Sequence, residues 1–423
     1  MMRLSVQVLV TTPNWPTFTH RRARRRTHAV VMNSTGCPAG DVACALVHAM
    51  EPSMPIYPKF SSAFLNPCVE TTQKTICLPY VHIISGWHMF SEESLGWLKH
   101  VKQLEVRGGG GCFDDWTGDS GRGWTQSWGG PPQSGAVIMT HCNKLLGWYP
   151  AFAGRYTSAW GNEYGPCKES QIAKDPHADY YAKYMWQVCR PRAIKAHDLA
   201  MGTGGSGKEA TPPFVMKALY GPSRVKVISA LRNPVDRLET SFWAHRHYPG
   251  KYGSSPDGFH KYVVEQTSAF NKCVSKEGDL RRCAYLFELL GQEYSDVFFH
   301  CDQLIRGLYE PFIRDWHNAF GRGSLLVIRT EELLDKPLAA RTKLLKFLNL
   351  PGSPTAEQLV ASAPTTTSYA QLHKKSLEEV KAMPMLNKTR ELAEAFYRPH
   401  NEQLGIMMEW TKAEAWPRSA SVL

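Results

Sequence analysis

Short runs of apolar, β-branched residues alternate along the chain with segments of helical character. The runs at Cys77–Ser85, Ala136–Cys142 and Val225–Leu231 have the length and composition of buried strands. Ser91 and Asn233 each stand where a helix N-cap would follow a strand. This alternation predicts an α/β fold with a mostly parallel central sheet flanked by helices.

Two further segments show helical character. One is residues 178–188. The other carries an apolar stripe with a spacing of four residues, which should lie against the sheet. The stripe consists of Leu304, Leu308, Phe312, Trp316 and Phe320.

The main folded domain is expected to span residues 76–412. Residues 1–75 lack sustained periodicity and predict a leader followed by irregular structure. The glycine-rich residues 107–135 predict a long surface insertion, and residues 413–423 a tail. No run of 18 or more apolar residues occurs, so no conventional membrane span is predicted.

Charge and cysteine content indicate a ligand class and a compartment. The formal net charge of +11 favours an anionic ligand. Neither an RNA-binding signature nor a Cys/His finger occurs, which argues against nucleic acid. Eleven cysteines, with sequons at Asn33 and Asn387, favour an oxidising compartment. The expected localisation is the Golgi lumen or the secretory pathway. The arginine run Arg21–Arg26 leaves an organellar transit peptide as the alternative.

Gly202–Glu209 has the spacing of a phosphate-binding P-loop, except that Glu209 replaces Ser or Thr. A P-loop follows a buried strand and leads directly into a helix. Here the preceding residues are poorly apolar, and Pro212 and Pro213 interrupt the turn after Lys208. We interpret the segment as a flexible connector rather than a nucleotide site.

The strand at Val225–Leu231 ends in Arg232, and Pro234 suits the first position of a helix. The string LRNPVDRLETSF resembles the 3′-phosphate motif of sulfotransferases that use 3′-phosphoadenosine 5′-phosphosulfate (PAPS). The resemblance implies that Arg232 and Thr240 hold the 3′-phosphate of this donor. The structural alternative is an Arg-Asn-Pro sequence that only caps a helix, with the arginine paired to a carboxylate.

Downstream of this motif lie the pair Cys273 and Cys283 and the segments LIRGLYEPFIRDWHNAF, LLVIRTEELL, KFLNLP and FYRPHNEQL. Together they resemble carbohydrate sulfotransferases of the N-acetylgalactosamine 4-sulfate 6-O type. The resemblance implies a P-loop-NTPase-like sulfotransferase fold, sulfonate transfer to a carbohydrate hydroxyl and no metal. The chain's positive charge suits PAPS and an acidic glycan. The two cysteines form either a disulfide or two buried free thiols.

The family's 5′-phosphosulfate loop reads Lys-x-Gly-Thr-Thr-Ser-Leu, and its counterpart here departs from that pattern. The residues at the lysine, glycine and two threonine positions are Met89, Ser91, Glu92 and Glu93. Protonated His88 is the candidate to replace the lysine, and the backbone amides at Ser91 are candidates to face the phosphate. The alternative is a catalytically weakened relative that binds cofactor or glycan.

The family also uses a base to take the proton of the acceptor hydroxyl. Its Lys-Glu element is best matched by Lys168 and Glu169, which implies Glu169 as the base and Lys168 as a charge stabiliser. His177 and His197 are reserve candidates. The alternative for each is an ordinary solvated or hydrogen-bonded side chain.

Overall fold

The computed structural model describes the predicted strands and much of the second half of the chain. The structure describes three long stretches without a break: 225–290, 303–350 and 367–411. It also describes the shorter stretches 65–84, 88–109, 136–142, 212–221 and 354–362. Scattered residues are described between 36 and 62 and at 297, 352 and 416. The predicted helix at 178–188 and the connector Gly202–Glu209 lie outside these residues. The predicted domain limits stay predictions.

The centre of the described fold is a five-stranded sheet in which every neighbouring pair is parallel. Its order across the sheet is β4 (Leu104–Gly109), β5 (Ala136–Cys142), β3 (Val81–Ile84), β6 (Lys226–Leu231) and β7 (Leu325–Arg329). The predicted mostly parallel central sheet is confirmed.

The first predicted strand, Cys77–Ser85, is divided in the structure. Its first residue ends β2 (Thr75–Cys77), which pairs antiparallel with β1 (Cys68–Glu70), and β3 starts only at Val81. Pro79 lies between the two and has no N–H to donate to a sheet ladder. The chain therefore leaves one sheet before the proline and enters the other after it.

The helix predicted after this strand is shorter than its pattern indicates. It consists of α2 (Ser91–Leu95) and the 3₁₀ helix η1 (Gly96–His100). The backbone N–H of Ser94 donates to Phe90 O at 3.0 Å, so Phe90 occupies the N-cap position and Ser91 is the first helical residue. β4 continues to Gly109 and so extends into the predicted insertion at 107–135.

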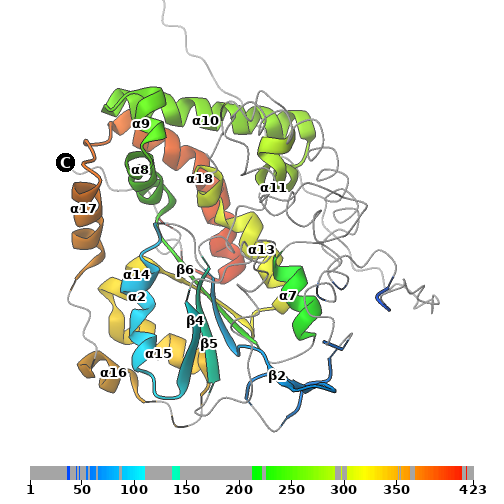
Figure 1. The fold of residues 1–423 in the computed structure, drawn as a ribbon. Helices are drawn as coiled ribbons and strands as arrows, with labels where there is room; N and C mark the ends of the chain where they lie inside the picture. Colours follow the sequence, from blue (N-terminus) through cyan, green and yellow to red (C-terminus); the bar gives the residue numbers. More distant parts are fainter. Residues whose placement is uncertain are drawn as a thin grey trace, which may run out of the picture.

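Both faces of the sheet are covered by helices (Figure 1). Along β6, Val227 and Leu231 belong to one apolar cluster and Ile228 and Ala230 to the other, as the two-residue period of a strand requires. The first cluster includes α7 (Pro212–Tyr220), α8 (Pro234–Ala244), α10 (Pro256–Glu277), α11 (Leu280–Leu290), α13 (Tyr309–Phe320) and α18 (Asn387–Met408). The second includes α2, η1, α14 (Thr330–Asp335), α15 (Pro337–Leu348) and α16 (Ala356–Ser362).

The apolar stripe predicted from the four-residue spacing is confirmed as a core feature. Its first four members are fully buried, and Phe320 packs partly buried against the same cluster as the sheet residue Leu231. α13 begins only at Tyr309, because the 3₁₀ helix η5 (Ile305–Gly307) precedes it.

The disulfide alternative for Cys273 and Cys283 is confirmed. The bond joins α10 to α11, with the two Cα atoms 6.0 Å apart. Two further disulfides connect Cys37 to Cys44 and Cys68 to Cys77. Among the described helices, none has the length and apolar character needed to cross a membrane.

Candidate functional site

Two adjacent strands send the chain in opposite directions across the sheet. From β3 the chain passes beyond β5 to β4, whereas from β6 it passes to β7 on the other side. The register pairs Ile84 with Ser229, so the carboxyl ends of β3 and β6 lie together. Open α/β sheets bind ligands at such a switch point. The segments that leave these two strands therefore form the candidate site.

Arg232 leaves the carboxyl end of β6 and is fully buried. Its Nη2 donates to Thr240 Oγ1 at 3.1 Å, and its Nη1 donates to the backbone oxygen of His88 at 2.9 Å. The guanidinium carbon lies 3.9 Å from the centroid of the Phe90 ring, within the range of a cation–π contact. The structure thus brings together the two residues predicted to share a phosphate, and Arg232 also ties the segment after β3 to the segment after β6.

The start of α8 agrees with the sequence-based prediction. Asn233 is its N-cap, with Oδ1 accepting from the backbone N–H of Val235 at 2.9 Å, and Pro234 is in the first turn. The backbone N–H of Asn233 donates to Glu331 Oε1 at 2.7 Å. The turn after β6 is therefore fixed both by its own cap and by the segment that follows β7.

A helix distant in sequence completes the surroundings of Arg232. α17 (Tyr369–Glu379) places the Tyr369 hydroxyl 3.2 Å from Nε and His373 Nδ1 2.6 Å from Nη2. In the described part of the chain, each hydrogen-bond partner of Arg232 is a neutral group. The simple carboxylate pairing offered as the structural alternative is not observed there.

Two carboxylates of α8 lie next to these groups. Asp236 accepts from the Tyr369 hydroxyl at 2.9 Å and pairs with Arg390 at 3.2 Å. Glu239 lies 3.8 Å from Arg390, and burial raises the pKa of its carboxyl to about 7. Ligand atoms of Asp236, Glu239 and His373 come within 4.8 Å of one another. Because Arg390 pairs with both carboxylates, the charges of this region are balanced within the protein.

The segment after β3 is held through its backbone. Met89, at the position of the family's lysine, is 1% exposed. Its backbone oxygen accepts a hydrogen bond from Thr330 Oγ1 at 2.9 Å, and its Sδ lies 3.6 Å from the Tyr309 hydroxyl. His88 and Phe90 adopt left-handed φ values of 61° and 55°. Such values are costly for residues other than glycine, so the contacts from Arg232 and Thr330, which directly follow β6 and β7, must hold the turn. Met89 is consequently a packed core residue.

His88 lies among cations. Its ring makes an edge contact with His245 at 5.6 Å between centroids, and its Nε2 is buried with no hydrogen-bond partner among the described residues. Burial, reinforced by Arg237 and His245, lowers the pKa of His88 to about 3. The side chain is therefore neutral in this structure, and a cationic role in place of the lysine stays a prediction that requires a bound anion.

Several predicted positions lie outside the described residues. They are Lys168 and Glu169, the reserve candidates His177 and His197, and Lys208 of the connector. The assignment of Glu169 as the base and Lys168 as the charge stabiliser stays a prediction. Glu92 belongs to α2, and the side chain of Glu93, in the same helix, is exposed.

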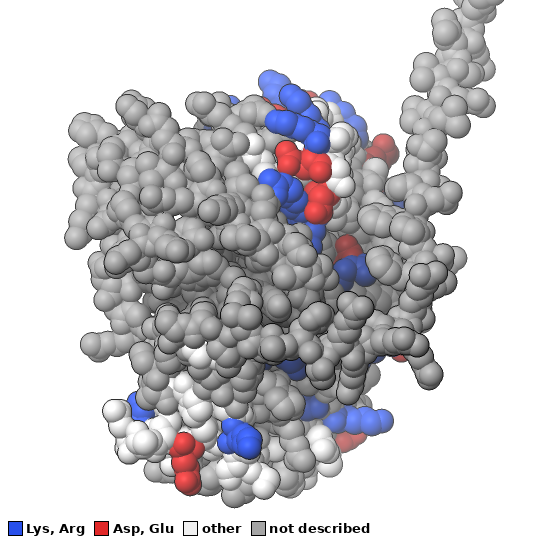
Figure 2. Space-filling view, turned by 90° about the vertical axis from the view of Figure 1, so that its right-hand side faces the viewer, with Lys and Arg blue, Asp and Glu red and all other residues white. Residues whose placement is uncertain are grey.

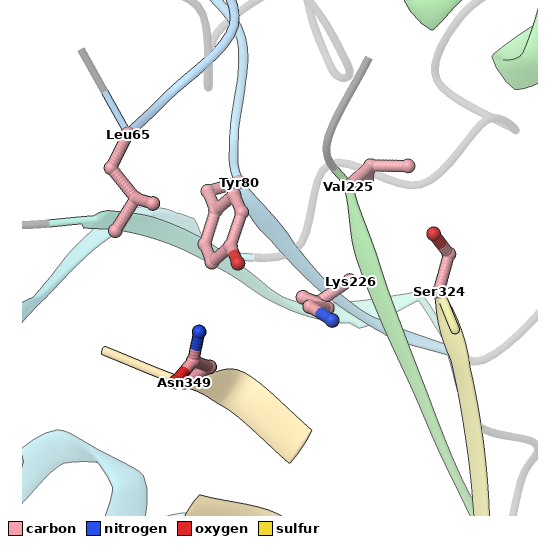
Figure 3. Close-up of a pocket in the computed structure, with 6 residues that line it drawn as sticks. All are labelled: Leu65, Tyr80, Val225, Lys226, Ser324 and Asn349. Atoms are coloured by element: carbon pink, nitrogen blue, oxygen red, sulfur yellow. The ribbon is translucent and has the colours of Figure 1, made fainter. Parts of the chain in front are cut away.

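A pocket of about 380 Å³ lies at the opposite end of β6 (Figure 3). Tyr80, Lys226 and Asn349 face it. The ammonium of Lys226 donates to Gly323 O at 2.8 Å and lies 4.6 Å from the Phe347 ring centroid. This pocket is remote from Arg232 along the strand and lacks the arginines of the switch point, so it is not the candidate site.

The described residues on the face drawn in Figure 2 form no large basic field. Among the described residues on that face, Lys and Arg side chains alternate with Asp and Glu side chains. An acidic acceptor therefore stays a prediction from the net charge.

A parallel sheet with a buried arginine at its switch point defines an α/β protein with a cationic strand-end site. Carbohydrate sulfotransferase 15 of Homo sapiens and that of Mus musculus are each 28% identical to this chain over 212 residues, or 49% of this chain and 34% of each relative. The chain thus spans about a third of the length of these relatives. Carbohydrate sulfotransferase 15 of Nototodarus sloanii is 28% identical over 151 residues, or 36% of this chain and 86% of the relative.

The predicted resemblance to carbohydrate sulfotransferases is confirmed by these relatives. A solved sulfotransferase from Alicyclobacillus acidocaldarius aligns with 80% of this chain and 99% of its own, at a TM-score of 0.37 and 15% identity. No family model matches the chain.

Sequence reasoning missed four residues around Arg232: Phe90, Tyr369, His373 and Arg390. The last three lie more than 130 positions beyond Arg232, on two helices whose local pattern does not show that they reach Arg232. Only the tertiary packing of α17 and α18 on α8 brings them there.

Proposed function

We propose that this protein is a sulfotransferase that moves a sulfonate group from PAPS to a hydroxyl of a carbohydrate acceptor. The observation that carries the proposal is the contact between buried Arg232 and Thr240 at the switch point. These are the two residues that the family resemblance assigns to the 3′-phosphate. The similarity to carbohydrate sulfotransferases supports the acceptor class.

The residues at the strand end suit a phosphate group. A guanidinium is charged at all relevant pH values, and the described hydrogen bonds of Arg232 go to neutral partners. The nearby carboxylates are paired with Arg390 instead. Arg232 and Thr240 would hold the 3′-phosphate, and Ser91, which begins α2, would face the phosphosulfate end.

PAPS would supply an activated sulfonate: its sulfur–oxygen bond to the 5′-phosphate breaks as the acceptor oxygen bonds to sulfur, and the acceptor proton passes to a base. Glu169 is the proposed base and Lys168 the proposed stabiliser of charge. His88, directly before the family's lysine position, is the proposed donor toward the leaving phosphate. Positioned hydrogen-bond donors at a leaving oxygen are among the strongest contributions to catalysis.

The secretory pathway, and the Golgi lumen in particular, is the proposed compartment. Three disulfides among the described residues support it, because such bonds persist in oxidising environments. Sequencing the amino terminus of the mature protein tests the assignment, since removal of an arginine-rich transit peptide would instead indicate an organelle.

Isothermal titration with adenosine 3′,5′-bisphosphate tests the proposed site. We expect binding by the wild type and a loss of about 100-fold or more in Arg232→Ala, because a charge-assisted pair of hydrogen bonds to phosphate disappears. Thr240→Val keeps the side-chain shape and should lose about tenfold. Arg322→Ala is the matched control, since it removes an exposed arginine paired with Glu409. No binding by the wild type, or equal binding by Arg232→Ala, would contradict the proposal.

Transfer of ³⁵S from labelled PAPS to a panel of glycans distinguishes an enzyme from a weakened relative that only binds. Buried Met89 at the lysine position is the observation that favours the second class. Turnover on any glycan in the panel excludes it. Cofactor binding without turnover across the panel would support it.

A further inference from the structure

The pocket at the amino end of β6 is formed by residues from four segments of the chain (Figure 3). Tyr80 precedes β3, Lys226 begins β6, Ser324 precedes β7 and Asn349 follows α15. The pocket volume of about 380 Å³ lies within the range of roughly 300 to 1,000 Å³ that is typical of small-molecule sites. Lys226 and Arg232 stand at opposite ends of one extended strand, roughly 20 Å apart. A ligand in this pocket would therefore leave the switch point free.

Three polar side chains of the pocket keep hydrogen-bonding capacity for a ligand. The Lys226 ammonium has three N–H groups, and its one hydrogen-bond acceptor among the described residues is Gly323 O at 2.8 Å. In the same part of the chain, the Ser324 hydroxyl and the Asn349 side-chain amide form no hydrogen bond. Asn349 ends α15 with a left-handed φ of 49°, which suits asparagine, and this backbone role leaves its amide available.

The positive charge of Lys226 has no negative partner within the described part of the chain. Besides Gly323, its described contact is the Phe347 ring, whose centroid lies 4.6 Å from the ammonium. Burial lowers the pKa of Lys226, and no described carboxylate opposes that shift. A bound anion would favour the charged form of the amine, so the pocket suits a negatively charged group. A single compact ammonium matches a group with one negative charge, such as a sulfate ester or a carboxylate.

The other described residues that line the pocket are largely apolar. Leu65 and Val225 contribute aliphatic side chains, and Tyr80 contributes a ring whose hydroxyl donates to Leu348 O at 3.3 Å. A few polar groups beside an apolar wall are typical of sites for small organic ligands. A sugar ring has C–H groups that pack against such a wall and hydroxyls that bind amide and hydroxyl groups. The lining therefore fits a sugar that carries an anionic substituent.

We propose that this pocket binds an anionic sugar unit, bearing a sulfate ester or a carboxylate, at a site separate from the switch point. Lys226 pairs with the anionic substituent, and Ser324 and Asn349 bind hydroxyls of the sugar. The choice of a sugar rests on the proposed function, because a carbohydrate acceptor brings such units to the protein. The pocket holds the glycan and takes no part in sulfonate transfer.

Isothermal titration of the full chain with N-acetylgalactosamine 4-sulfate and with unsulfated N-acetylgalactosamine tests this proposal. In Lys226→Gln we expect affinity for the sulfated sugar to fall about tenfold or more, because a charge-assisted hydrogen bond is lost, while the unsulfated sugar changes less than about threefold. Lys226→Arg keeps the charge and should retain most of the affinity. Glucuronic acid, titrated in parallel, shows whether a carboxylate binds as well as a sulfate, and Lys226-dependent binding of either acid supports the proposal.

A second variant tests the pocket without changing Lys226. Asn349→Asp keeps the size of the side chain and tolerates the left-handed backbone, but it places a negative charge beside the bound anion. It should lose about tenfold for the sulfated sugar and little for the unsulfated one. Lys343→Gln, which removes an exposed lysine of α15 that pairs with Glu332, is the matched control and should bind both sugars as the wild type does.

Titration with adenosine 3′,5′-bisphosphate separates this proposal from the proposed function. Lys226→Gln should bind the bisphosphate as the wild type does, which also shows that the variant is folded, and Thr240→Val should bind the sulfated sugar normally. A wild type that binds neither acidic sugar, or losses that follow Thr240→Val and spare Lys226→Gln and Asn349→Asp, would overturn the pocket as the site. Neither result would change bisphosphate binding, whose absence in the wild type would instead contradict the proposed function.

Discussion

Two basic regions at the end of the sheet differ in the charged groups that act on their titratable side chains. One region, the Arg232 group, contains Arg232, Asp236, Glu239, His373 and Arg390, and its charges and hydrogen bonds are largely satisfied within the protein. The second region, called the basic cluster, consists of His88, Arg237, His245 and Arg306. Burial lowers the pKa of His88 to about 3 and that of His245 to about 4, and the described charged groups that act on these two histidines are all basic. The first region is organised before any ligand arrives. The second region disfavours the charged form of its two histidines.

Replacing Arg232 is expected to have the largest effect. Arg232→Met removes four hydrogen bonds of a fully buried side chain and frees the turn at His88, so the free energy of unfolding should fall by about 3 kcal/mol or more. His88→Asn should cost clearly less, because Nε2 of the His88 ring makes no hydrogen bond among the described residues and asparagine tolerates the left-handed backbone there. Urea denaturation of the two variants measures both values. Equal losses would erase the contrast between the two regions.

In the Arg232 group, Glu239 should make the main contribution to the pH dependence of stability. Its pKa is raised from 4.5 to about 7 by burial and Asp236, against the opposing charges of Arg390 and Arg232. Between these values the folded state holds a proton that the unfolded chain has released. Stability should therefore fall as pH rises from 5 to 8, by up to about 3 kcal/mol from this group.

Glu239→Gln isolates that contribution, because glutamine mimics the protonated acid and does not titrate. Urea denaturation at pH 5, 6, 7 and 8 should show that the stability of the wild type, relative to Glu239→Gln, declines over this range. A constant difference between the two proteins would show that Arg390 keeps Glu239 ionised in the folded state.

The basic cluster should respond to pH in the opposite direction. The pKa of His88 falls from 6.5 to about 3, chiefly through burial. Below pH 6.5 the His88 side chain is protonated in the unfolded chain but stays neutral in the folded protein. The free energy of unfolding should therefore fall as the pH falls. The loss attributable to His88 is about 2 kcal/mol at pH 5, measured as the stability of the wild type relative to His88→Asn at pH 5 and 7.5. Identical pH profiles of the two proteins would contradict this.

Sequence alone predicted the parts of the site that are encoded locally. The strand pattern, the N-cap residue Asn233 and Pro234 are adjacent in the sequence. Together they predict the turn that places Arg232 at the end of the strand. The apolar stripe that includes Phe312 was also predicted correctly, because its spacing of four residues is visible within one short segment. The division of the first strand at Pro79 was missed, because the apolar pattern continues through the proline while its hydrogen bonding does not.

The charge balance of the site could not be predicted, because it depends on long-range contacts. His373 and Arg390 reach α8 from helices that follow more than 130 residues later, and Arg306 reaches His88 through the packing of η5 on α8. The family-like segments in η5 and α18 do not show which side chains these charged groups contact. The same long-range packing brings carboxylates and Arg390 together in one region and brings further basic groups to the histidines of the other.

The smallest effect is expected at the edge of the Arg232 group. Tyr369→Phe removes a hydroxyl that accepts from Arg232 Nε at 3.2 Å and donates to Asp236 at 2.9 Å, while the ring stays packed near Phe90. We expect a loss of about 1 kcal/mol in stability and a severalfold loss of affinity for adenosine 3′-monophosphate, because Arg232 becomes less fixed. Ser368→Ala, which removes only the cap of α17, is the matched control and should lower stability without changing that affinity. If both variants weakened the ligand equally, α17 would act as a simple cover and Tyr369 would have no part in positioning Arg232.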